Sequence, residues 1–406
     1  MTNEIKNQKI EFPQWPQYDD EDIKAVTDVI KSGKWWIGAP AKKVGMNGWL
    51  FQEEFAKFQE SKYAFGCTNG THAIEIALSA LGIGFNDEVI VPVTSFVATA
   101  SAVIAVNAIP IFCDVDPETF NIDHRKIESL ITKRTKAIIA VHLGGMPCQM
   151  DEIVNIAQKH NLKVIEDCAH AHGSRFKGKR VGNWGDAGTF SFQASKIITS
   201  GEGGAIICNN DYLAKRIYSY LDAGRQIGKY FYNHYVYGSN FRIPELCAAL
   251  LRTQLKKFPE QHKIRNENGK YLRKILDEID GIRCQKRSED VDECGYYVFP
   301  VKFDPTKFKN ITKAEFYKYL KDHGIPTDDC YPPMFQLGLF KNMKLKKGIN
   351  YSRANWGKSK SNPKNWPVAM DIFNHSFELS QRVLLGKKEH MDYIRDVILD
   401  LKKSRK

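Results

Sequence analysis

A lysine that follows an apolar, β-branched run is the first residue whose position suggests covalent chemistry. Lys196 closes the segment Thr189–Lys196, which also contains Ser191 and Ser195. Burial at the end of a strand would lower the pKa of the lysine, and a neutral amine can attack a carbonyl group to form an imine. A lysine at such a junction is more often a surface residue, so this interpretation needs support from other motifs.

A carboxylate at the end of another apolar run supplies that support. Asp167 ends the segment Lys163–Asp167, and His170 and His172 follow it. A buried carboxylate is costly unless it meets a cation or a hydrogen-bond donor, and a protonated pyridine nitrogen is one such cation. A metal ion is the alternative, but this acid–His–His spacing matches no standard zinc motif, so we predict no metal site.

Two stretches of small residues are candidates for holding a phosphate group. Gly70 and Thr71 stand where a helix is expected to begin, and free N–H groups at a helix N-terminus bind phosphate. Ordinary capping by Thr68, Asn69 or Thr71 is the alternative. The run Ser200–Gly204 has three glycines directly before an apolar segment, which permits a close approach of the backbone to a ligand.

An α/β layer is needed to bring these motifs together, and residues 62–209 have the required alternation. Apolar runs alternate with segments of helical spacing, such as Thr71–Leu81 and Met150–His160. This pattern indicates a mainly parallel sheet, whose ligands bind beyond the carboxyl ends of the strands. The predicted strands are Glu88–Val91, Ile109–Val115, Ala137–His142, Lys163–Asp167, Gly188–Phe192 and Gly204–Cys208.

The pattern changes beyond about residue 210, where helical spacing dominates. A second α/β region follows, with a strand expected over Tyr296–Phe303 and a helix over Lys313–His323. We therefore predict a large domain with an N-terminal arm over residues 1–260 and a small C-terminal domain over residues 261–406.

The composition limits the classes of protein. The formal charge is +12, but the basic residues are spread along the chain without a nucleic-acid-binding motif, so we predict no nucleic-acid partner. No apolar run reaches the roughly 20 residues of a membrane span. Residues 1–9 lack the apolar core of a signal peptide, which makes the cytoplasm the expected location. The nine cysteines include no CxxC motif and argue against a disulfide framework.

In combination, four motifs resemble the DegT/DnrJ/EryC1/StrS family of aminotransferases, which depend on pyridoxal 5′-phosphate (PLP). These motifs are Thr68–Ala73, Glu166–Gly173, Ser191–Lys196 and Gly201–Gly204, and the resemblance covers about residues 12–390. It implies the α/β fold of a type I PLP-dependent transferase, in which a large domain with a mainly parallel seven-stranded sheet carries a smaller C-terminal α/β domain.

A subgroup of this family, the 3-amino-5-hydroxybenzoate (AHBA) synthases, is similar to the chain in several further segments. These are residues 12–20, Trp35-Trp36, the His170/His172 pair, Gln193 and residues 382–385. A departure from many sugar aminotransferases is Tyr331-Pro332-Pro333, where those enzymes carry a His after the Tyr-Pro pair. The departure argues against a standard nucleotide-sugar pocket.

The resemblance implies roles for residues around the reactive part of the cofactor. Lys196 would form the Schiff base and shuttle a proton, and Asp167 would keep the pyridine nitrogen protonated. His170 would lie near the phenolic oxygen of the cofactor, and Phe96 would stack on its ring.

The resemblance also implies a phosphate cradle formed by Gly70, Thr71 and Ser191. Asn240 matches a residue that reaches the phosphate from the neighbouring subunit, which implies a homodimer with shared active sites.

The activity that the resemblance implies is transfer of an amino group from glutamate or glutamine to a keto sugar or ketocyclitol, in amino-sugar, polysaccharide or secondary-metabolite biosynthesis. One alternative is an AHBA synthase-like dehydration of an aminodeoxy dehydroshikimate. The other is a non-catalytic regulatory protein, against which the intact Lys196 and Asp167 argue. The basic segment Lys341–Lys364 is expected to be a long insertion, either a plain surface loop or part of the substrate mouth.

Overall fold

The computed structural model describes residues 10–37, 45–341, 345–357 and 362–404. Its central layer is a seven-stranded sheet in the order β1-β9-β8-β5-β4-β2-β3, in which β9 is antiparallel to its neighbours and the other pairs are parallel. The strands are β1 (Tyr63–Cys67), β2 (Glu88–Pro92), β3 (Ile109–Cys113), β4 (Thr135–Val141), β5 (Lys163–Asp167), β8 (Ala187–Ser191) and β9 (Gly204–Cys208). The predicted fold class is confirmed, and β1 is the strand of this sheet that the sequence did not indicate.

Helices with an apolar stripe pack against this sheet. On α6, for example, Ile153 and Ala157 are buried, while Asp151 and Glu152 lie in the first turn, where the helix dipole favours negative charge. The helices of this part are α1 (Asp20–Ser32), α2 (Asn47–Phe58), α3 (Gly70–Ala80), α4 (Ala98–Ala105), α5 (His124–Ile127), α6 (Met150–Lys159) and α7 (Asp211–Leu221).

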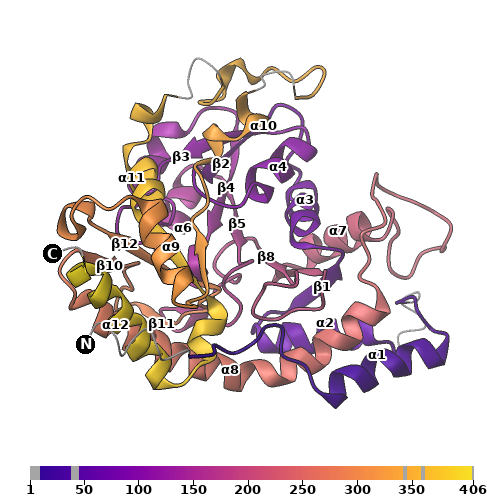
Figure 1. Cartoon of the computed structure of the whole chain (residues 1–406). Coiled ribbons are helices and arrows are strands. Elements are labelled where there is room, and N and C mark those ends of the chain that lie inside the picture. The colour runs from indigo at the N-terminus through magenta and orange to yellow at the C-terminus, as the bar shows by residue number, and fades with distance from the viewer. Residues whose placement is uncertain (1–9, 38–44, 342–344, 358–361, 405–406) are drawn as a thin grey trace.

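A second, four-stranded antiparallel sheet has the order β10-β12-β14-β13 (Figure 1). Its strands are β10 (Ile282–Cys284), β12 (Val298–Phe303), β13 (Thr327–Asp329) and β14 (Ser376–Ser380), and its helices are α9 (Lys313–Asp322), α11 (Pro367–His375) and α12 (Lys388–Ser404). The short helix α10 (Gly338–Lys341) lies against the central sheet instead, where Phe340 packs on Phe112 of β3 with ring centres 5.1 Å apart. A small third sheet joins β11 (Val291–Glu293), β6 (Arg175–Phe176) and β7 (Lys179–Arg180).

The long helix α8 (Glu245–Asp277) runs under both α/β parts and packs against α1, α2 and α12 (Figure 1). The predicted boundary at residues 260 and 261 falls inside this helix, and the division into domains at that point stays a prediction. No helix in the described part of the chain has both the length and the apolar character that crossing a bilayer requires.

Part of the basic segment 341–364 packs on the central sheet. The prediction of a plain surface loop is therefore wrong for that part of the described residues. The side chains of Tyr351 and Trp356 are buried. Trp356 Nε1 donates to the carbonyl oxygen of Pro110 at 2.7 Å. Asn355 accepts from the N–H of Phe112 at 2.9 Å and donates to its carbonyl oxygen at 2.6 Å. These contacts join residues more than 240 positions apart, so local periodicity contains no sign of them.

Candidate active site

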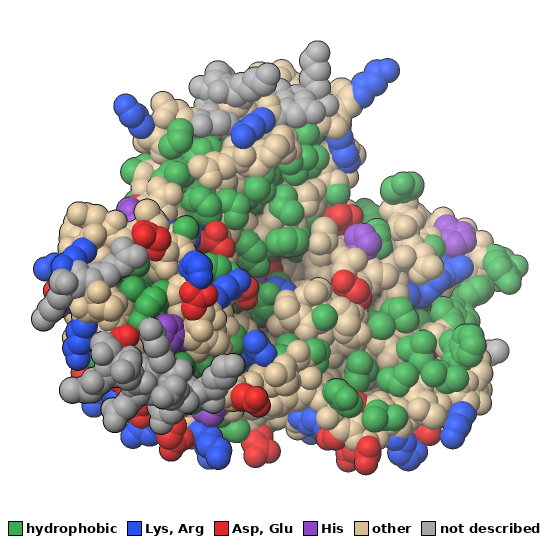
Figure 2. Space-filling view, in the orientation of Figure 1, with side chains coloured by type: hydrophobic (Ala, Val, Ile, Leu, Met, Phe, Trp, Pro, Cys, Tyr) green, Lys and Arg blue, Asp and Glu red, His purple; other side chains and the backbone are tan. Residues whose placement is uncertain are grey.

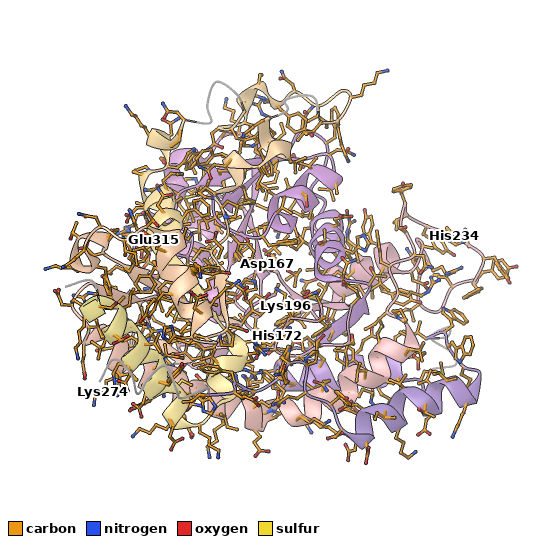
Figure 3. The ribbon with its side chains drawn as sticks, viewed as in Figure 1. Asp167, His172, Lys196, His234, Lys274 and Glu315 are labelled. Atoms are coloured by element: carbon orange, nitrogen blue, oxygen red, sulfur yellow. The ribbon has the colours of Figure 1, made fainter. Side chains whose placement is uncertain are left out.

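The predicted site residues meet at the carboxyl ends of the central strands. Asp167 ends β5 and Ser191 ends β8, while Gly70 begins α3. Figure 3 places Asp167, Lys196 and His172 together in the middle of the molecule, and His234 far from them at the end of a projecting segment. The parallel sheet therefore brings together motifs that are about 100 residues apart in the sequence.

Lys196 is buried without an ion pair to any described residue. Its side chain is 8% exposed, and Nζ lies 3.9 Å from the centre of the Tyr297 ring. Burial lowers the pKa of Lys196 to about 8, although the charges of Asp167 and Glu378 oppose that shift. At pH 7 roughly a tenth of the amine is therefore neutral, far more than for an exposed lysine, and imine formation requires the neutral form.

Asp167 presents a buried carboxyl group beside this lysine. Its Oδ2 accepts from Thr99 Oγ1 at 2.9 Å, and its Oδ1 accepts from the N–H of Ala169 at 3.2 Å. Burial raises the pKa of Asp167, and these hydrogen bonds and the Lys196 charge only partly offset the effect. A further cation placed against this group would stabilise its charged form.

His170 is held neutral in a defined tautomer. Burial lowers its pKa well below the ordinary value, and the charge of Lys196 adds to the shift. The N–H of Gly144 donates to Nδ1 at 3.3 Å, so the ring proton is on Nε2, 3.5 Å from the hydroxyl oxygen of Tyr331. His170 is thus a neutral donor within the site. His172, by contrast, packs between Phe190 and Phe192 and belongs to the core.

The predicted phosphate cradle is a tight backbone junction at the start of α3. Asn69 caps the helix by accepting from the N–H of His72 at 2.8 Å, which settles the choice among the three candidate caps. A Cβ atom on Gly70 would lie 2.8 Å from Ser191 Cβ, and one on Gly204 would lie 2.4 Å from the carbonyl group of Asn69. Only glycine fits at these two positions, so the glycines let the strand ends approach the helix N-terminus.

Thr71 lies in the first turn of α3, half-buried. Asn240 is exposed and directly precedes Phe241, whose carbonyl oxygen accepts from the N–H of Thr68 at 2.9 Å. Asn240 is therefore close to the turn before α3 in its own chain.

Two phenols from the smaller α/β part complete the wall of the site and were not among the predicted site residues. Tyr297 Oη lies 2.8 Å from Ser195 Oγ, and the Tyr297 ring lies 4.2 Å from that of His170. The ring of Tyr331 is 6.0 Å from that of Phe96, which is 54% exposed. The available signals were a tyrosine near the start of the strand predicted over Tyr296–Phe303 and another in the unusual Tyr-Pro-Pro segment.

These residues fit a phosphorylated pyridine cofactor of the kind that the resemblance implies. The buried carboxyl group of Asp167 can pair with a protonated ring nitrogen, and the unpaired amine of Lys196 can react with an aldehyde. The glycine-lined start of α3 can hold a phosphate group. The exposed ring of Phe96 offers a flat apolar surface at the same place.

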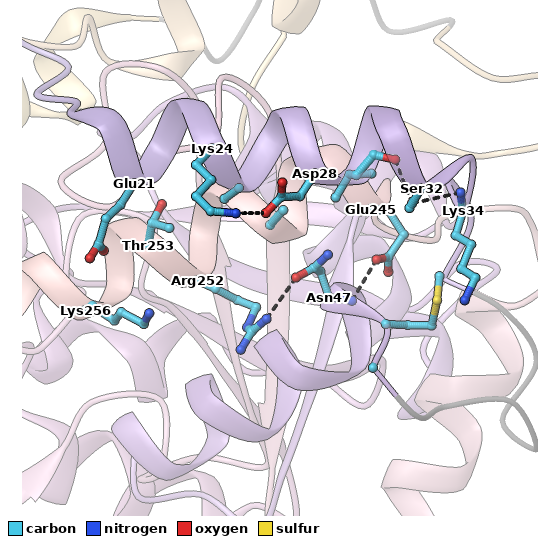
Figure 4. Close-up of a pocket in the computed structure, with 15 residues that line it drawn as sticks. Glu21, Lys24, Asp28, Ser32, Lys34, Asn47, Glu245, Arg252, Thr253 and Lys256 are labelled. Atoms are coloured by element: carbon cyan, nitrogen blue, oxygen red, sulfur yellow. Dashed lines mark hydrogen bonds and ion pairs between the residues drawn. The ribbon is translucent and has the colours of Figure 1, made fainter.

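A separate pocket of about 530 Å³ lies between α1 and α8 (Figure 4). Its polar groups largely satisfy one another: Glu245 accepts from the N–H groups of Asn47 and Gly48, and Arg252 donates to the Asn47 side chain. These contacts fix the start of α2 against α8, which is a structural role.

The model of the DegT/DnrJ/EryC1/StrS aminotransferase family matches residues 16–361 of the chain. The chain belongs to this family. Three comparisons place it among the family's members. An L-glutamine:2-deoxy-scyllo-inosose aminotransferase from Streptomyces fradiae is 34% identical over 392 residues, 94% of this chain and 92% of its own length.

The chain is also similar to AHBA synthases, both in a comparison of sequences and in a comparison of solved structures. A 3-amino-5-hydroxybenzoate synthase from Amycolatopsis mediterranei is 37% identical over 290 residues, 71% of this chain and 74% of its own length. A solved structure of a 3-amino-5-hydroxybenzoic acid synthase matches with a TM-score of 0.87 and 30% identity, covering 98% of this chain and 100% of that one. Membership in this aminotransferase family makes the chain an enzyme that transfers amino groups.

Proposed function

We propose that the enzyme uses PLP, bound through Lys196, to move an amino group from glutamine to a ketocyclitol or keto sugar. The buried, unpaired Lys196 beside the buried Asp167 carries this proposal. The donor and the ring ketone are taken from the aminocyclitol-forming relative, which aligns over nearly the whole chain.

Bound PLP would act as an electron sink that stabilises negative charge on the substrate carbon. Lys196 Nζ, with its pKa of about 8, accepts a proton from that carbon and returns it to the product side. Asp167 would stabilise positive charge at the ring nitrogen of the cofactor, and Phe96 would pack on its ring. The Nε2–H of His170, which lies 3.5 Å from the hydroxyl oxygen of Tyr331, would be available as a hydrogen-bond donor to the cofactor.

Steady-state turnover with glutamine tests this function. We expect the purified enzyme with PLP to aminate 2-deoxy-scyllo-inosose or a related ring ketone, with parallel-line kinetics because donor and acceptor use one site in turn. Failure to react with glutamine or glutamate would contradict an aminotransferase and favour the non-catalytic regulatory alternative.

An AHBA synthase-like reaction is the second candidate, because a sequence and a solved structure of that name align with the chain. In that reaction Lys196 would still transfer the proton, but the enzyme would remove water from an aminodeoxy dehydroshikimate instead of passing an amino group to a ketone. Aromatic product appearing from that substrate at a higher kcat/KM than amination of ring ketones would replace the first proposal.

We further propose a homodimer with shared active sites. Large hydrophobic side chains are exposed on α1, on the residues that follow it up to Ile37, on α7 and on the segment between α7 and α8. Figure 2 shows hydrophobic groups gathered over this part of the molecule. Exposed aromatic clusters are typical of protein interfaces. They include Trp35, Trp36, Tyr212, Tyr230, Tyr232 and Tyr237.

Mixing two variants that are each defective tests whether residues of both subunits form one active site. Asn240→Asp is expected to weaken cofactor binding by placing negative charge near the phosphate, and Lys196→Ala removes the amine. If Asn240 serves the partner's site, each mixed dimer contains one intact site, and random exchange should restore about a quarter of the wild-type activity. No recovery after exchange, in a dimer verified by light scattering, would place Asn240 in its own subunit's site.

We also propose a cytoplasmic location, since all nine cysteines are free and eight of them are buried, as suits a reducing compartment. Fractionation of producing cells would check it.

A further inference from the structure

The face of one aromatic ring meets the reactive amine of the site. Tyr297 directly precedes β12 of the smaller α/β part, and the centre of its ring lies 3.9 Å from Lys196 Nζ. Lys196 is buried, and Nζ forms no ion pair with a described residue. The face of an aromatic ring is electron-rich and attracts a cation within about 6 Å of its centre. Tyr297 is therefore placed to act on the charge of this amine.

Hydrogen bonds already occupy the phenol hydroxyl group of Tyr297. Gln193 Oε1 accepts from the N–H of Ser195 at 2.9 Å and from its hydroxyl group at 2.6 Å. The one hydroxyl proton of Ser195 is thus used, so Ser195 Oγ accepts from the Tyr297 hydroxyl group at 2.8 Å. The ring of His170 packs on that of Tyr297, with centres 4.2 Å apart. These contacts fix the phenol and leave its ring face as the part that acts on Lys196.

The other titratable groups around Lys196 are two acids and several neutral groups. The charges of Asp167 in β5 and Glu378 in β14 raise the pKa of Lys196, while burial, the larger influence, lowers it. Burial lowers the pKa of each nearby histidine and raises that of each nearby phenol, so four groups stay neutral as the lysine titrates: His170, His172, Tyr297 and Tyr331. Among the described residues, the ring of Tyr297 is therefore the group in direct contact with the charge of the amine.

The proposed function requires Lys196 to carry a charge that burial disfavours. When Nζ takes a proton from the substrate carbon, the C–H bond breaks, its electron pair stays on the carbon, and Nζ becomes an ammonium group. A buried ammonium group is costly without a partner. A carboxylate in contact with it would stabilise the charge so strongly that little neutral amine would remain for imine formation. The weaker attraction of a ring face permits both forms.

We propose that Tyr297 is a catalytic residue whose ring face stabilises the ammonium form of Lys196 while Nζ carries the proton from the substrate side to the product side. This assignment rests on the proposed function, because it presumes that Lys196 is the proton carrier. It gives the smaller α/β part a direct contact with a reacting atom.

The test measures the acid dissociation constant of Lys196 in the cofactor-free enzyme, which a purely structural role of Tyr297 would not change. Trace acetylation with acetic anhydride over a range of pH, followed by mass spectrometry of the peptide that contains Lys196, gives this constant. In Tyr297→Leu it should rise about tenfold, because the ammonium form loses the ring while the neutral amine loses little. Tyr297→Phe keeps the ring and should stay within about twofold of wild type.

The catalytic consequence is measured in the enzyme loaded with PLP. Single-turnover reaction with glutamine should be about tenfold slower in Tyr297→Leu, because the proton-carrying form of Lys196 is less stable. Tyr297→Phe should lose less than about threefold.

One further titration needs a control, since burial raises the pKa of Glu378 to about 8, in the range of Lys196. The comparison is therefore repeated with Glu378→Gln in both chains, where the tenfold ratio should persist. Tyr18→Leu, at an exposed position outside the site, should leave the constant at its wild-type value.

If Tyr297→Leu does not fold, Tyr297→Met provides a second side chain that fills the space without a ring. A dissociation constant that stays at the wild-type value in the ring-free variant would overturn the role of Tyr297 and leave the proposed function intact. A wild-type enzyme that does not react with glutamine or glutamate would overturn the proposed function and this assignment with it.

Discussion

Replacing Lys196 with Ala is expected to lower kcat for transamination by at least about 10⁴-fold, since it removes both the imine-forming amine and the proton carrier. The side chain is buried and its Nζ lies over the Tyr297 ring, so no other described amine is placed to substitute for it. The measurement is single-turnover kinetics with glutamine, together with the visible absorbance of the lysine-bound cofactor, which should be lost.

Two comparison variants separate amine chemistry from charge. Lys196→Arg retains a cation but cannot deprotonate, so it should be as inactive as Ala. Lys263→Ala, at an exposed position of α8, should behave as wild type. Turnover in Lys196→Ala within tenfold of wild type would show that another group forms the imine.

Replacing Asp167 with Asn should lower kcat/KM on the order of 10³-fold, because the amide has nearly the same shape but no charge to stabilise a protonated ring nitrogen. The carboxyl group is buried at the end of β5, where water cannot replace it. Steady-state kinetics at saturating PLP would measure the loss separately from any weaker cofactor binding.

Thr99→Val offers a graded control for this residue. It removes the 2.9 Å hydrogen bond to Asp167 Oδ2 but keeps the charge, so the loss should be about tenfold. If kcat/KM fell equally in Asp167→Asn and Thr99→Val, Asp167 would contribute through its position and not through its charge.

The strand ends could be predicted from the sequence because the motifs there are local. Asp167 and Ser191 follow apolar runs, and these runs become β5 and β8 with bounds close to those expected. The contact between Gly70 and Ser191 was implied only by the resemblance, since spacing in the sequence does not indicate which loops meet.

The wall formed by Tyr297 and Tyr331 could not be predicted in the same way. These residues come from segments next to β12 and β13, and they join the site only because the two α/β parts pack together. Their contacts with Ser195 and His170 join positions more than 100 residues apart, so they are features of the tertiary structure.

The contacts of Asn355 and Trp356 with β3 have a consequence for solubility. β3 is the last strand of the central sheet, and an open sheet edge presents unpaired N–H and C=O groups to which another chain can add a strand. The amide group of Asn355 occupies the N–H and the carbonyl of Phe112 as a neighbouring peptide group would. Asn355 and Trp356 thus cover part of this edge within one molecule, which disfavours edge-to-edge pairing with another chain.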